Sequence, residues 1–400
     1  MVAINKKSHS LEKTLAAKQN GKPLKVLFVS HTYVVGINQG KLAAIAQTGA
    51  EVGLLVPDPW QAKSWGQLFS LERVCLAVQY FPAKVFFNGR TGAYVYQIGS
   101  LLQAIRSFSP DVLQVEEEVF SLSTFQLAVV ARLTQTPMVV FGWENLEQSL
   151  PRLRRWTRRF VLETARLIVA GNQDGANLLR GWGYRGAVSV MPQMGVDPAV
   201  FAGEVRSLPA DRPFRIGFMG RLVYDKGIDL IFEAARLLKL EGLLLEIVLC
   251  GSGAEAEALK ADAKSKGLVD QTVWQGKVPH ADVPVAMAKF DALVLPSRTV
   301  ATWKEQFGHV LIEAMSMGIP VIGSSSGEIP NVVGCTDQVF DEGNAEDLAE
   351  KLRRVMADPQ AYEAASQRGL EKVATHYTHE KIAQQLVAGW QTAIEQDVSR

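Results

Sequence analysis

Short apolar runs alternate with longer stretches of helical periodicity along most of the chain. Strands are predicted at 24–30, 51–57, 77–82, 111–115, 137–141, 167–170, 188–191, 214–219, 243–250, 272–275, 292–295, 320–323 and 338–340. Helices are predicted at 41–48, 228–240, 254–266, 309–317, 345–357 and from 359 onward. Glycine, proline or polar clusters bound each strand, and helices separate them. This alternation is typical of parallel sheets built from βαβ units.

The alternation breaks at 194–213, which is rich in Pro, Gly and Asp and reads as a linker between domains. A chain of 400 residues also exceeds what one hydrophobic core usually serves. We therefore expect an α/β protein with two Rossmann-like, doubly wound domains that face each other across a deep interdomain cleft. The expected domains are 24–195 and 196–377, after a polar extension at 1–23. A C-terminal helix at about 378–400 is expected to pack back on the first domain.

The composition is that of an ordinary globular enzyme, with 48% hydrophobic and 21% charged residues. No apolar run approaches the roughly 20 residues that span a bilayer, and the N-terminus lacks the apolar stretch of a signal peptide. Cys75, Cys250 and Cys335 show no metal-ligand spacing and fit a reducing compartment. These features predict a cytoplasmic location.

Charge is distributed unevenly. Residues 1–200 hold 21 Lys+Arg and 13 Asp+Glu, whereas residues 201–400 hold 21 and 28. The asymmetry indicates different partners for the two halves, or chance drift between two solvated surfaces. The segment 151–159, PRLRRWTRR, is the densest basic stretch. It is interpreted as facing an anionic membrane, as an exposed helix with Leu153 and Trp156 tucked inward, or as a site for an anionic acceptor. The membrane-facing candidates are Arg154, Arg155, Trp156 and Arg158.

The most informative stretch is 296–323, PSRTVATWKEQFGHVLIEAMSMGIPVIG. It contains Glu305 before a predicted helix and Glu313 within it. The paired carboxylates of a glycosidase lie roughly 5–9.5 Å apart, whereas eight helical residues advance about 12 Å. A better interpretation is that Glu305 faces a sugar, Glu313 accepts hydrogen bonds from ribose, and backbone N–H groups near Gly308 face an oxygen of the ligand. The alternative is that Glu313 caps or pairs within an ordinary helix.

A second stretch, GFMGRLVYDKG at 217–227, follows the first strand of the second domain. Gly220 lets the chain turn sharply, and Arg221 and Lys226 present two cations, which suits a diphosphate. The alternative is two solvated surface cations. The turn Gly251-Ser252-Gly253 allows close approach of a ligand, but by itself it is a weak signal.

Four segments, in their order along the chain, resemble the retaining family-four glycosyltransferases of the GT-B fold. They are GRLVYDKG, GSG, EQFGHVLIEAMSMGIPVI and SSSGEIP. The resemblance covers the second domain and is weaker in the first, where PQMGVDPAVF also matches. It implies that Arg221 and Lys226 hold the donor diphosphate and that Glu313 binds ribose. Glu305 would bind the transferred sugar. The other implied donor-binding residues are Gly220, Ser252, Gly253, Val278, His280, Phe307, Gly308 and His309.

The resemblance also implies that no metal or other cofactor is needed, and the sequence contains no Asp-x-Asp motif. Retention in this family is thought to proceed by front-face attack of the acceptor hydroxyl, with the leaving phosphate helping to remove its proton. Many members carry a histidine after the fifth strand of the first domain. Here the matching stretch is PMVVFGWENLEQ, which has none.

Because this histidine is missing, other residues must be considered for contact with the acceptor. Candidates are His31 and Gly36 on the first loop, Glu117 after the strand at 111–115, and Glu144 and Asn145 in the departing stretch. His31 could instead be a turn residue that bonds its own backbone. The cluster that contains Glu117 could likewise be a solvated turn.

The sequence thus predicts a metal-independent, retaining glycosyltransferase of the hexosyltransferase type. It would move a sugar from a nucleoside-diphosphate sugar, with UDP favoured by family frequency alone. The acceptor would be a hydroxyl of a glycan or lipid-linked glycan, in the cytoplasm or peripherally on the inner face of the plasma membrane, and no nucleic acid partner is expected. The alternatives are a sugar-nucleotide epimerase of similar fold and an inactive relative that only binds glycan or nucleotide.

Overall fold

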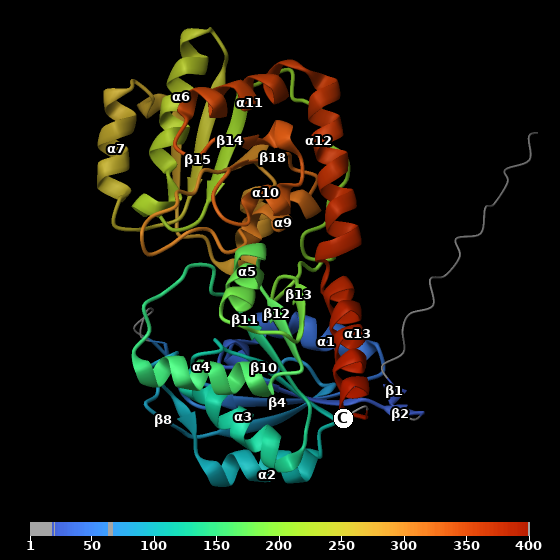
Figure 1. Ribbon diagram of the computed structural model, residues 1–400. Coiled ribbons are helices and arrows are strands. Elements are labelled where there is room, and N and C mark those ends of the chain that lie inside the picture. The colour runs from blue at the N-terminus through green and yellow to red at the C-terminus, as the bar shows by residue number, and fades with distance from the viewer. Residues whose placement is uncertain (1–17, 20, 63–66, 399–400) are drawn as a thin grey trace, which may run out of the picture. The chain divides into compact units, whose positions relative to one another are not determined.

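The computed structural model describes residues 18–19, 21–62 and 67–398, so the predicted extension at 1–23 lies largely outside the described residues. The chain divides into two compact units. Unit 1 comprises residues 1–140, 156–167 and 382–400, and unit 2 comprises residues 141–155 and 168–381. Figure 1 follows the chain through both.

The first large sheet has seven strands in the order β13-β12-β11-β10-β3-β4-β7. The internal strand β3 buries every residue except Lys25 at its start, as expected for a strand covered on both faces. The strands are β3 (Lys25–Val29), β4 (Glu51–Pro57), β7 (Val78–Ala83), β10 (Val112–Glu116), β11 (Met138–Gly142), β12 (Leu167–Ala170) and β13 (Ala187–Val190). The helices along this part of the chain are α1 (Gly40–Gln47), α2 (Ile98–Phe108), α3 (Leu122–Thr134), α4 (Arg152–Thr164) and α5 (Gln173–Gly181).

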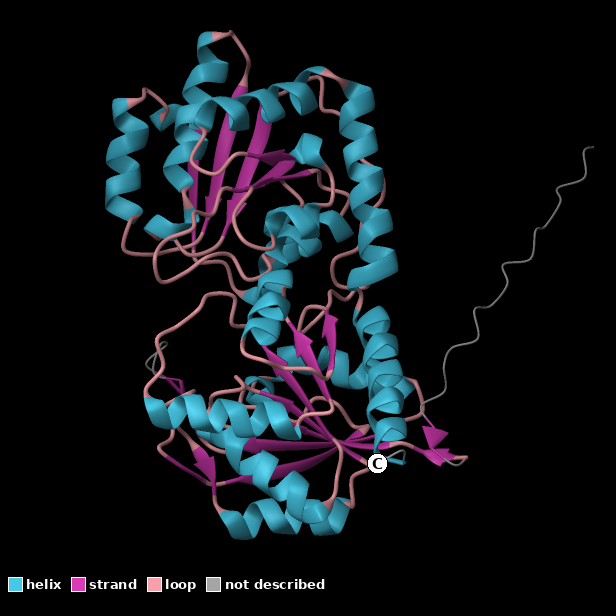
Figure 2. Cartoon of the chain, viewed as in Figure 1, coloured by secondary structure: helices cyan, strands magenta, loops and turns pink. Residues whose placement is uncertain are grey.

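The second sheet lies in unit 2 and has six strands in the order β16-β15-β14-β17-β18-β19, all paired in parallel. Helices flank the strands of each sheet (Figure 2). The strands are β14 (Phe214–Met219), β15 (Leu245–Cys250), β16 (Thr272–Gly276), β17 (Ala292–Leu295), β18 (Val321–Ser324) and β19 (Val339–Phe340). The helices are α6 (Ile228–Leu240), α7 (Ala256–Ser265), α8 (Val283–Met287), α9 (His309–Ser316), α10 (Ile329–Val333), α11 (Ala345–Ala357) and α12 (Pro359–Lys372).

In both sheets the first strand along the chain is an internal strand. The next two strands are added on one side of it, and the later strands are added on the other side. Counted along the chain, the second sheet has the order 3-2-1-4-5-6, and the first has the same order with a seventh strand added. This is the doubly wound order that the alternating pattern predicted. All thirteen predicted strands are confirmed, with ends displaced by a few residues.

Three two-stranded ribbons were not predicted because their strands are only two or three residues long and carry little periodicity. They are β1 (Lys18–Gln19) with β2 (Lys22–Pro23), β5 (Trp60–Ala62) with β6 (Gln67–Phe69), and β8 (Val85–Phe86) with β9 (Val95–Tyr96). The last two follow β4 and β7 and lengthen the loops of unit 1.

Residues 194–213, interpreted as a linker between domains, form no helix or strand and lie within unit 2, where Arg206 fixes them to the rest of the unit. The Arg206 guanidinium donates to the backbone oxygens of Met317, Ala288 and Phe290. The predicted C-terminal helix is α13 (His379–Val398), whose residues from Ile382 belong to unit 1. Its Trp390 is fully buried, packs edge-to-face on Phe28, and donates from Nε1 to Gln114 at 2.8 Å.

Candidate functional site

In unit 2, the sheet reverses its direction of growth at β14, which pairs with β15 on one side and β17 on the other. The connections leaving the carboxyl ends of β14 and β17 therefore run to opposite sides, and open α/β sheets bind ligands at such a point. The loops that leave β14, β15 and β17 are residues 220–227, 251–255 and 296–308. They carry most of the predicted donor-binding residues.

A cavity of about 320 Å³ lies at the carboxyl ends of β14 and β15. Four predicted residues line it: Gly220, Arg221, Ser252 and Val278. Gly253 lies directly behind, and a Cβ there would stand only 2.1 Å from the backbone oxygen of Leu222. The two loops thus pack backbone to backbone, which any larger residue at Gly253 would prevent. The remaining lining residues are Met219, Cys250, Gly251, Lys277 and Val283.

The two predicted cations of the β14 loop stand in different environments. Lys226 is nearly buried, and its Nζ lies 2.5 Å from Glu305 Oε2 and 4.5 Å from the centre of the Trp303 ring. Ser297 donates from Oγ to the same carboxylate oxygen at 2.7 Å. By contrast, the Arg221 side chain is 68% exposed, and its nearest carboxylate, Asp225, is 4.0 Å away. One cation is therefore neutralised within the protein, whereas the other faces solvent beside the cavity.

Helix α9 begins at the segment Phe307-Gly308-His309. Gly308 is the N-cap residue and has φ of 82°, a backbone conformation that glycine adopts without strain. Burial lowers the pKa of His309 to about 4, so this imidazole is neutral at physiological pH. Burial also raises the pKa of Glu313 to about 7. Among the described residues Glu313 has no hydrogen-bond or salt-bridge partner, which leaves its carboxyl group available to hydroxyl donors.

The loop after β11 departs from the family pattern, and its Asn145 binds the backbone beside Glu305. Asn145 is buried, and its Nδ2 donates to the backbone oxygens of Lys304 and Glu305 at 3.3 and 3.2 Å. A further brace comes from the Lys304 side chain, which pairs with Asp174 at 2.6 Å. Glu144 accepts instead from within its own loop, from Leu146 N at 3.2 Å. Asn145 therefore belongs with Glu305, which the sequence did not indicate.

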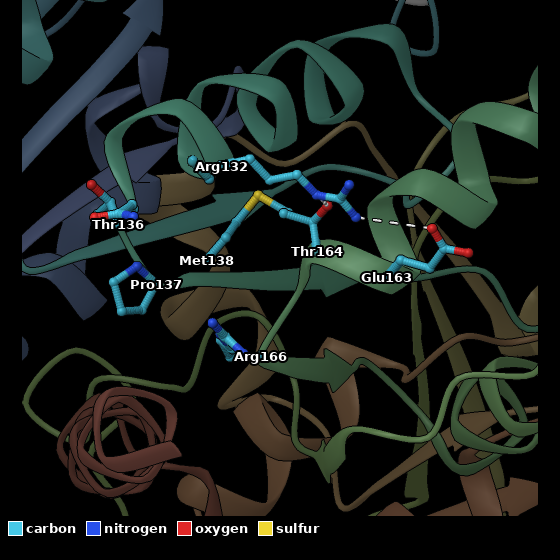
Figure 3. A pocket seen from close by; sticks show the side chains of 9 residues that line it. Arg132, Thr136, Pro137, Met138, Glu163, Thr164 and Arg166 are labelled. Carbon is cyan, nitrogen blue, oxygen red and sulfur yellow. Dashed lines mark hydrogen bonds and ion pairs between the residues drawn. The ribbon is translucent and has the colours of Figure 1, made fainter. Parts of the chain in front are cut away.

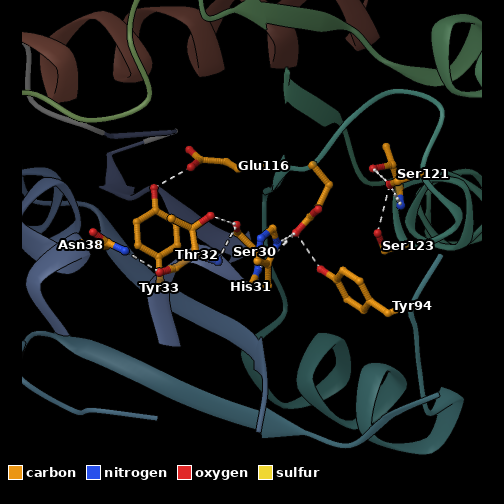
Figure 4. A network of polar contacts seen from close by, with 11 residues as sticks. Ser30, His31, Thr32, Tyr33, Asn38, Tyr94, Glu116, Ser121 and Ser123 are labelled. Carbon is orange, nitrogen blue, oxygen red and sulfur yellow. Dashed lines mark hydrogen bonds and ion pairs between the residues drawn. The ribbon is translucent and has the colours of Figure 1, made fainter. Parts of the chain in front are cut away.

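A polar network in unit 1 contains His31 and Tyr94 (Figure 4), and both bind Glu117. Glu117 Oε1 accepts from His31 Nδ1, from the His31 backbone N–H at 3.2 Å, and from the Tyr94 hydroxyl at 2.7 Å. The Trp60 ring lies 4.9 Å from the imidazole and 5.0 Å from the Tyr94 ring. Burial lowers the pKa of His31, but the adjacent carboxylate outweighs it and the net shift is upward. Neither a self-bonded turn nor a solvated turn describes this pair.

The neighbouring carboxylate, Glu116, belongs to the core. Its two oxygens accept from Lys41 Nζ at 2.6 Å and from the Tyr33 hydroxyl at 2.5 Å, and all three residues are nearly inaccessible. Strand alternation sends Glu116 and Glu117 to opposite faces at the end of β10. Buried charges of this kind are held by their partners and are not free for a ligand.

The remaining predicted residues lie apart from these clusters. Gly36 donates its N–H to Glu72 at 2.6 Å and lines a cavity of about 620 Å³ between residues 36–47 and 74–77. His280 is exposed and does not line the cavity beside Arg221. On α4, Arg155 and Trp156 are exposed, whereas Arg154 and Arg158 are partly buried. Trp156 is thus not tucked inward as one interpretation supposed.

Sequence reasoning missed Ser297, Trp303, Trp60 and Tyr94. Ser297 follows the strand at 292–295 by two residues, so its place at a carboxyl end was available as a signal. The aromatic residues carry no such signal, because they approach Lys226 and His31 only through the fold.

Another cavity, of about 480 Å³, lies at the amino ends of β11 and β12, the edge where such sheets do not usually bind ligands. Figure 3 shows Arg132 and Glu163 joined there. Arg132 also donates to Thr164 at 2.8 Å and lies over the Phe160 ring, so packing in the protein already uses its guanidinium. Within the described residues, no group of three or more His, Cys, Asp or Glu side chains could hold a metal ion. No helix in the same residues is long and apolar enough to cross a bilayer.

The chain is similar to known glycosyltransferases along most of its length. Residues 204–372 match the model for glycosyl transferases group 1, and residues 39–193 match the glycosyl transferase 4-like domain. The 2-deoxystreptamine glucosyltransferase of Streptomyces kanamyceticus is 28% identical over 172 residues, which are 42% of this chain and 43% of that one. The amylovoran biosynthesis glycosyltransferase AmsK of Erwinia amylovora is 31% identical over 166 residues, 41% and 40% of the two chains. These matches span less than half the length of either relative.

A solved glycosyltransferase structure has the same fold as this chain. HepE of Anabaena, in complex with UDP, superposes with a TM-score of 0.68 over 92% of this chain and 100% of that one, at 18% identity. HepE has also been solved in complex with UDP-glucose. The two family models show the family, and this likeness together with the two doubly wound sheets shows the fold. The chain belongs to the group 1, family-four glycosyltransferases and has their GT-B fold.

Proposed function

We propose that the chain transfers a sugar from a nucleoside-diphosphate sugar to a hydroxyl group, with retention of configuration and without a metal ion. The observation that supports this most strongly is the arrangement at the sheet reversal of unit 2. There the Lys226–Glu305 pair, held by Ser297, lies in the loops that also carry the exposed Arg221. Glu313, which has no partner among the described residues, lies on helix α9 directly after these loops. Charged, hydrogen-bonding groups gathered at the carboxyl ends of parallel strands suit a charged, polyhydroxylated ligand.

Each of these side chains has a separate role in the proposed binding of the donor. Arg221 and Lys277 line the 320 Å³ cavity and supply positive charge for the diphosphate. Glu313, ionised above pH 7, accepts from ribose hydroxyls. Glu305 accepts from hydroxyls of the transferred sugar, and Lys226 divides its charge between Glu305 and the diphosphate. Asn145 acts through Glu305 by fixing the backbone on which that carboxylate is carried.

The reaction exchanges one bond at the anomeric carbon for another. The bond from that carbon to the diphosphate oxygen breaks, and its electron pair stays on the oxygen. The acceptor hydroxyl oxygen bonds the same face of the carbon, and its proton passes to the departing diphosphate. Arg221, Lys226 and the N-terminus of α9 stabilise the charge that develops on the leaving group. His309 is neutral and contributes no net charge there.

The donor we propose is a UDP-sugar, because HepE, which shares the fold, has been solved with UDP and with UDP-glucose. The acceptor we propose is a glycan or a lipid-linked glycan, since one relative acts in amylovoran biosynthesis. His31, Glu117 and Trp60 are the proposed acceptor-side groups of unit 1. An imidazole beside a carboxylate and two aromatic rings offers both donors and acceptors to sugar hydroxyls.

The test is turnover with a panel of UDP-, GDP- and ADP-sugars in the presence of a broad mixture of glycan and glycolipid acceptors. We expect release of one nucleoside diphosphate that depends on acceptor, survives EDTA, and is lost in Glu305→Gln. Conversion of the sugar nucleotide without acceptor would instead identify an epimerase. Binding without any turnover would identify an inactive relative.

A further inference from the structure

The segment Gly327-Glu328 packs against the backbone of Glu305. Gly327 has φ of 54°, and a Cβ at this position would stand only 2.0 Å from the backbone oxygen of Glu305. The next residue, Glu328, donates its backbone N–H to the same oxygen at 3.1 Å. The close approach requires glycine at position 327, and it fixes Glu305 through its main chain. The segment belongs to SSSGEIP, to which the proposed reaction assigns no role.

The Glu328 side chain is buried, and both of its carboxylate oxygens are bonded within the protein. Oε2 accepts from the backbone N–H of Gln173 at 2.9 Å, and Oε1 accepts from Asn331 Nδ2 at 3.2 Å. Gln173 is the first residue of α5, and the first N–H groups of a helix have no acceptor within it. The helix dipole also favours a carboxylate at this end. Glu328 therefore binds the start of α5.

The first turn of α5 is connected in turn to the residue before Glu305. Asp174, the second residue of the helix, pairs with Lys304 Nζ at 2.6 Å. Asn145 donates to the backbone oxygens of both Lys304 and Glu305. All of these residues belong to unit 2. A closed chain of contacts thus runs from the Glu305 backbone through Glu328 and α5 back to Lys304.

We propose that Glu328 is a positioning residue that acts through Glu305. It ties the segment that binds the Glu305 backbone to the first turn of α5, and so keeps the Glu305 carboxylate in place for the transferred sugar. The inference rests on the proposed function, in which Glu305 binds hydroxyls of that sugar. Misplacement of a reacting group by about 1 Å can lower a rate roughly a hundredfold, so the backbone beneath such a carboxylate must be rigid.

A direct contact between Glu328 and the donor is the other role that this carboxylate could have. Both of its oxygens already accept hydrogen bonds, and the residue is only 7% exposed, which favours positioning. Glutamine has the same shape and can still accept from Gln173, while the Asn331 amide can turn to accept from it. Positioning therefore tolerates Glu328→Gln, whereas a contact that needs negative charge does not.

The test combines transfer, UDP affinity and backbone hydrogen exchange of residues 303–308. Transfer is measured with the same panel of donors and acceptors as above. Glu328→Ala should lower kcat/KM roughly tenfold to a hundredfold and accelerate exchange at 303–308. Its affinity for UDP in calorimetry should equal that of wild type, because UDP carries no sugar for Glu305 to bind. Glu328→Gln should recover most of the lost transfer.

Two further variants test whether the effect passes through Glu305. Gly327→Ala displaces the Glu305 backbone, because its Cβ meets the Glu305 oxygen, and should lower kcat/KM at least as much as Glu328→Ala. In the Glu305→Gln variant, adding Glu328→Ala should cause little further loss, since the carboxylate that Glu328 positions is already gone.

The matched control removes a carboxylate from the start of another helix of unit 2. Asp358 accepts from the backbone N–H groups of Gln360 and Ala361 at the start of α12, at 2.9 and 3.1 Å. Asp358→Ala should leave both transfer and the exchange of residues 303–308 as in wild type. Loss of a helix cap by itself is thereby separated from loss of the Glu305 position.

Three results would overturn the proposal. One is wild-type exchange of residues 303–308 in Glu328→Ala. Another is wild-type transfer by Glu328→Ala and Gly327→Ala. The third is a Glu328→Gln variant as impaired as Glu328→Ala, which would assign the carboxylate to the ligand. Absence of transfer by the wild-type protein would instead contradict the proposed function, and hydrogen exchange would still decide whether Glu328 fixes the Glu305 backbone.

Discussion

The two units place a basic side chain and a carboxylate at the same topological position, with different chemistry. In each sheet the basic residue follows the first strand: His31 after β3, and Lys226 after β14. The carboxylate follows the fourth strand of the sheet along the chain, which pairs with the first strand: Glu117 follows β10, and Glu305 follows β17. Doubly wound topology therefore explains why both sheets carry a charged pair at this point.

The difference lies in what surrounds each pair. Lys226 shares its loop with the exposed Arg221, which lines a cavity together with Lys277. The adjacent Glu117 carboxylate raises the pKa of His31 against the opposing effect of burial, and the Trp60 and Tyr94 rings lie beside the imidazole. The surroundings in unit 2 suit a diphosphate, whereas those in unit 1 suit a neutral, hydroxylated ligand. The topology of the sheet places each pair of side chains, and the residues around the pair determine which kind of ligand it suits.

The largest expected effect is on stability and concerns a third pair, Lys41 with Glu116, which is buried in the core. Lys41→Met removes the buried cation that pairs with the Glu116 carboxylate, and should lower the free energy of unfolding by about 3–5 kcal/mol. Urea unfolding measures this. The control is Lys25→Met, whose 3.6 Å pair with Glu51 is partly exposed and should contribute about 1 kcal/mol or less. Equal losses would contradict the distinction between core and surface pairs.

Next in size is the effect on turnover in unit 2. Glu305→Gln keeps the shape of the side chain but weakens the contacts with Lys226 and Ser297. We expect at least a hundredfold loss of turnover, about 2.7 kcal/mol of transition-state stabilisation, measured by release of nucleoside diphosphate. Glu246→Gln, which loses a carboxylate paired with Arg215 on the same sheet, is the matched control and should retain activity. Wild-type activity in Glu305→Gln would remove this pair from the reaction.

A smaller effect concerns the pH dependence of nucleotide binding. Since burial raises the pKa of Glu313 to about 7, this carboxyl is mostly protonated at pH 6 and ionised at pH 8. If its ionised form accepts from ribose, UDP affinity should rise up to about tenfold over that range, as calorimetry can measure. Without ligand, the raised pKa means that stability falls as pH rises from about 4.5 to 7. Glu313→Gln should abolish both dependences while keeping the pH response of UDP itself.

The smallest expected effect tests the pair in unit 1. The pKa of His31 is raised in the folded protein, so its stabilisation is fully present below the unfolded value of about 6.5 and is lost as pH rises through the folded pKa. The difference in unfolding free energy between wild type and His31→Gln should therefore be greatest in mild acid. Glu117→Gln should lower the pKa of His31 in an NMR titration. A pH-independent difference would show that the imidazole is held neutral.

Most of the fold could be predicted because its signal is local. Apolar runs such as 292–295 and 214–219 are buried throughout or nearly so, and their spacing alone indicated two doubly wound sheets. The donor loops were also visible, since Gly220, Gly253 and Gly308 stand where the backbone turns or approaches closely. In unit 1 the loops after β4 and β7 carry short ribbons with no clear period, and these were missed.

The candidate site was predicted less completely because its partners are distant in sequence. Asn145 binds backbone 160 residues away, and nothing in the local sequence indicates that contact. Glu116 and Glu117 are adjacent, yet one belongs to the core and the other to the polar network, because strand alternation sends them to opposite faces. The pairing of Lys226 with Glu305 likewise emerges only when β14 and β17 lie side by side.

The most direct measurement is thermal unfolding with millimolar UDP, GDP or ADP, for wild type, for Arg221→Ala/Lys226→Ala and for the control Lys260→Ala/Lys264→Ala on α7. A nucleotide present at a hundred times its dissociation constant adds about 2.7 kcal/mol to stability. We expect UDP to raise the unfolding midpoint of wild type and of the control, and to leave the Arg221→Ala/Lys226→Ala variant unchanged. Equal shifts in all three proteins, or no shift with any nucleotide, would contradict a diphosphate site at the sheet reversal of unit 2.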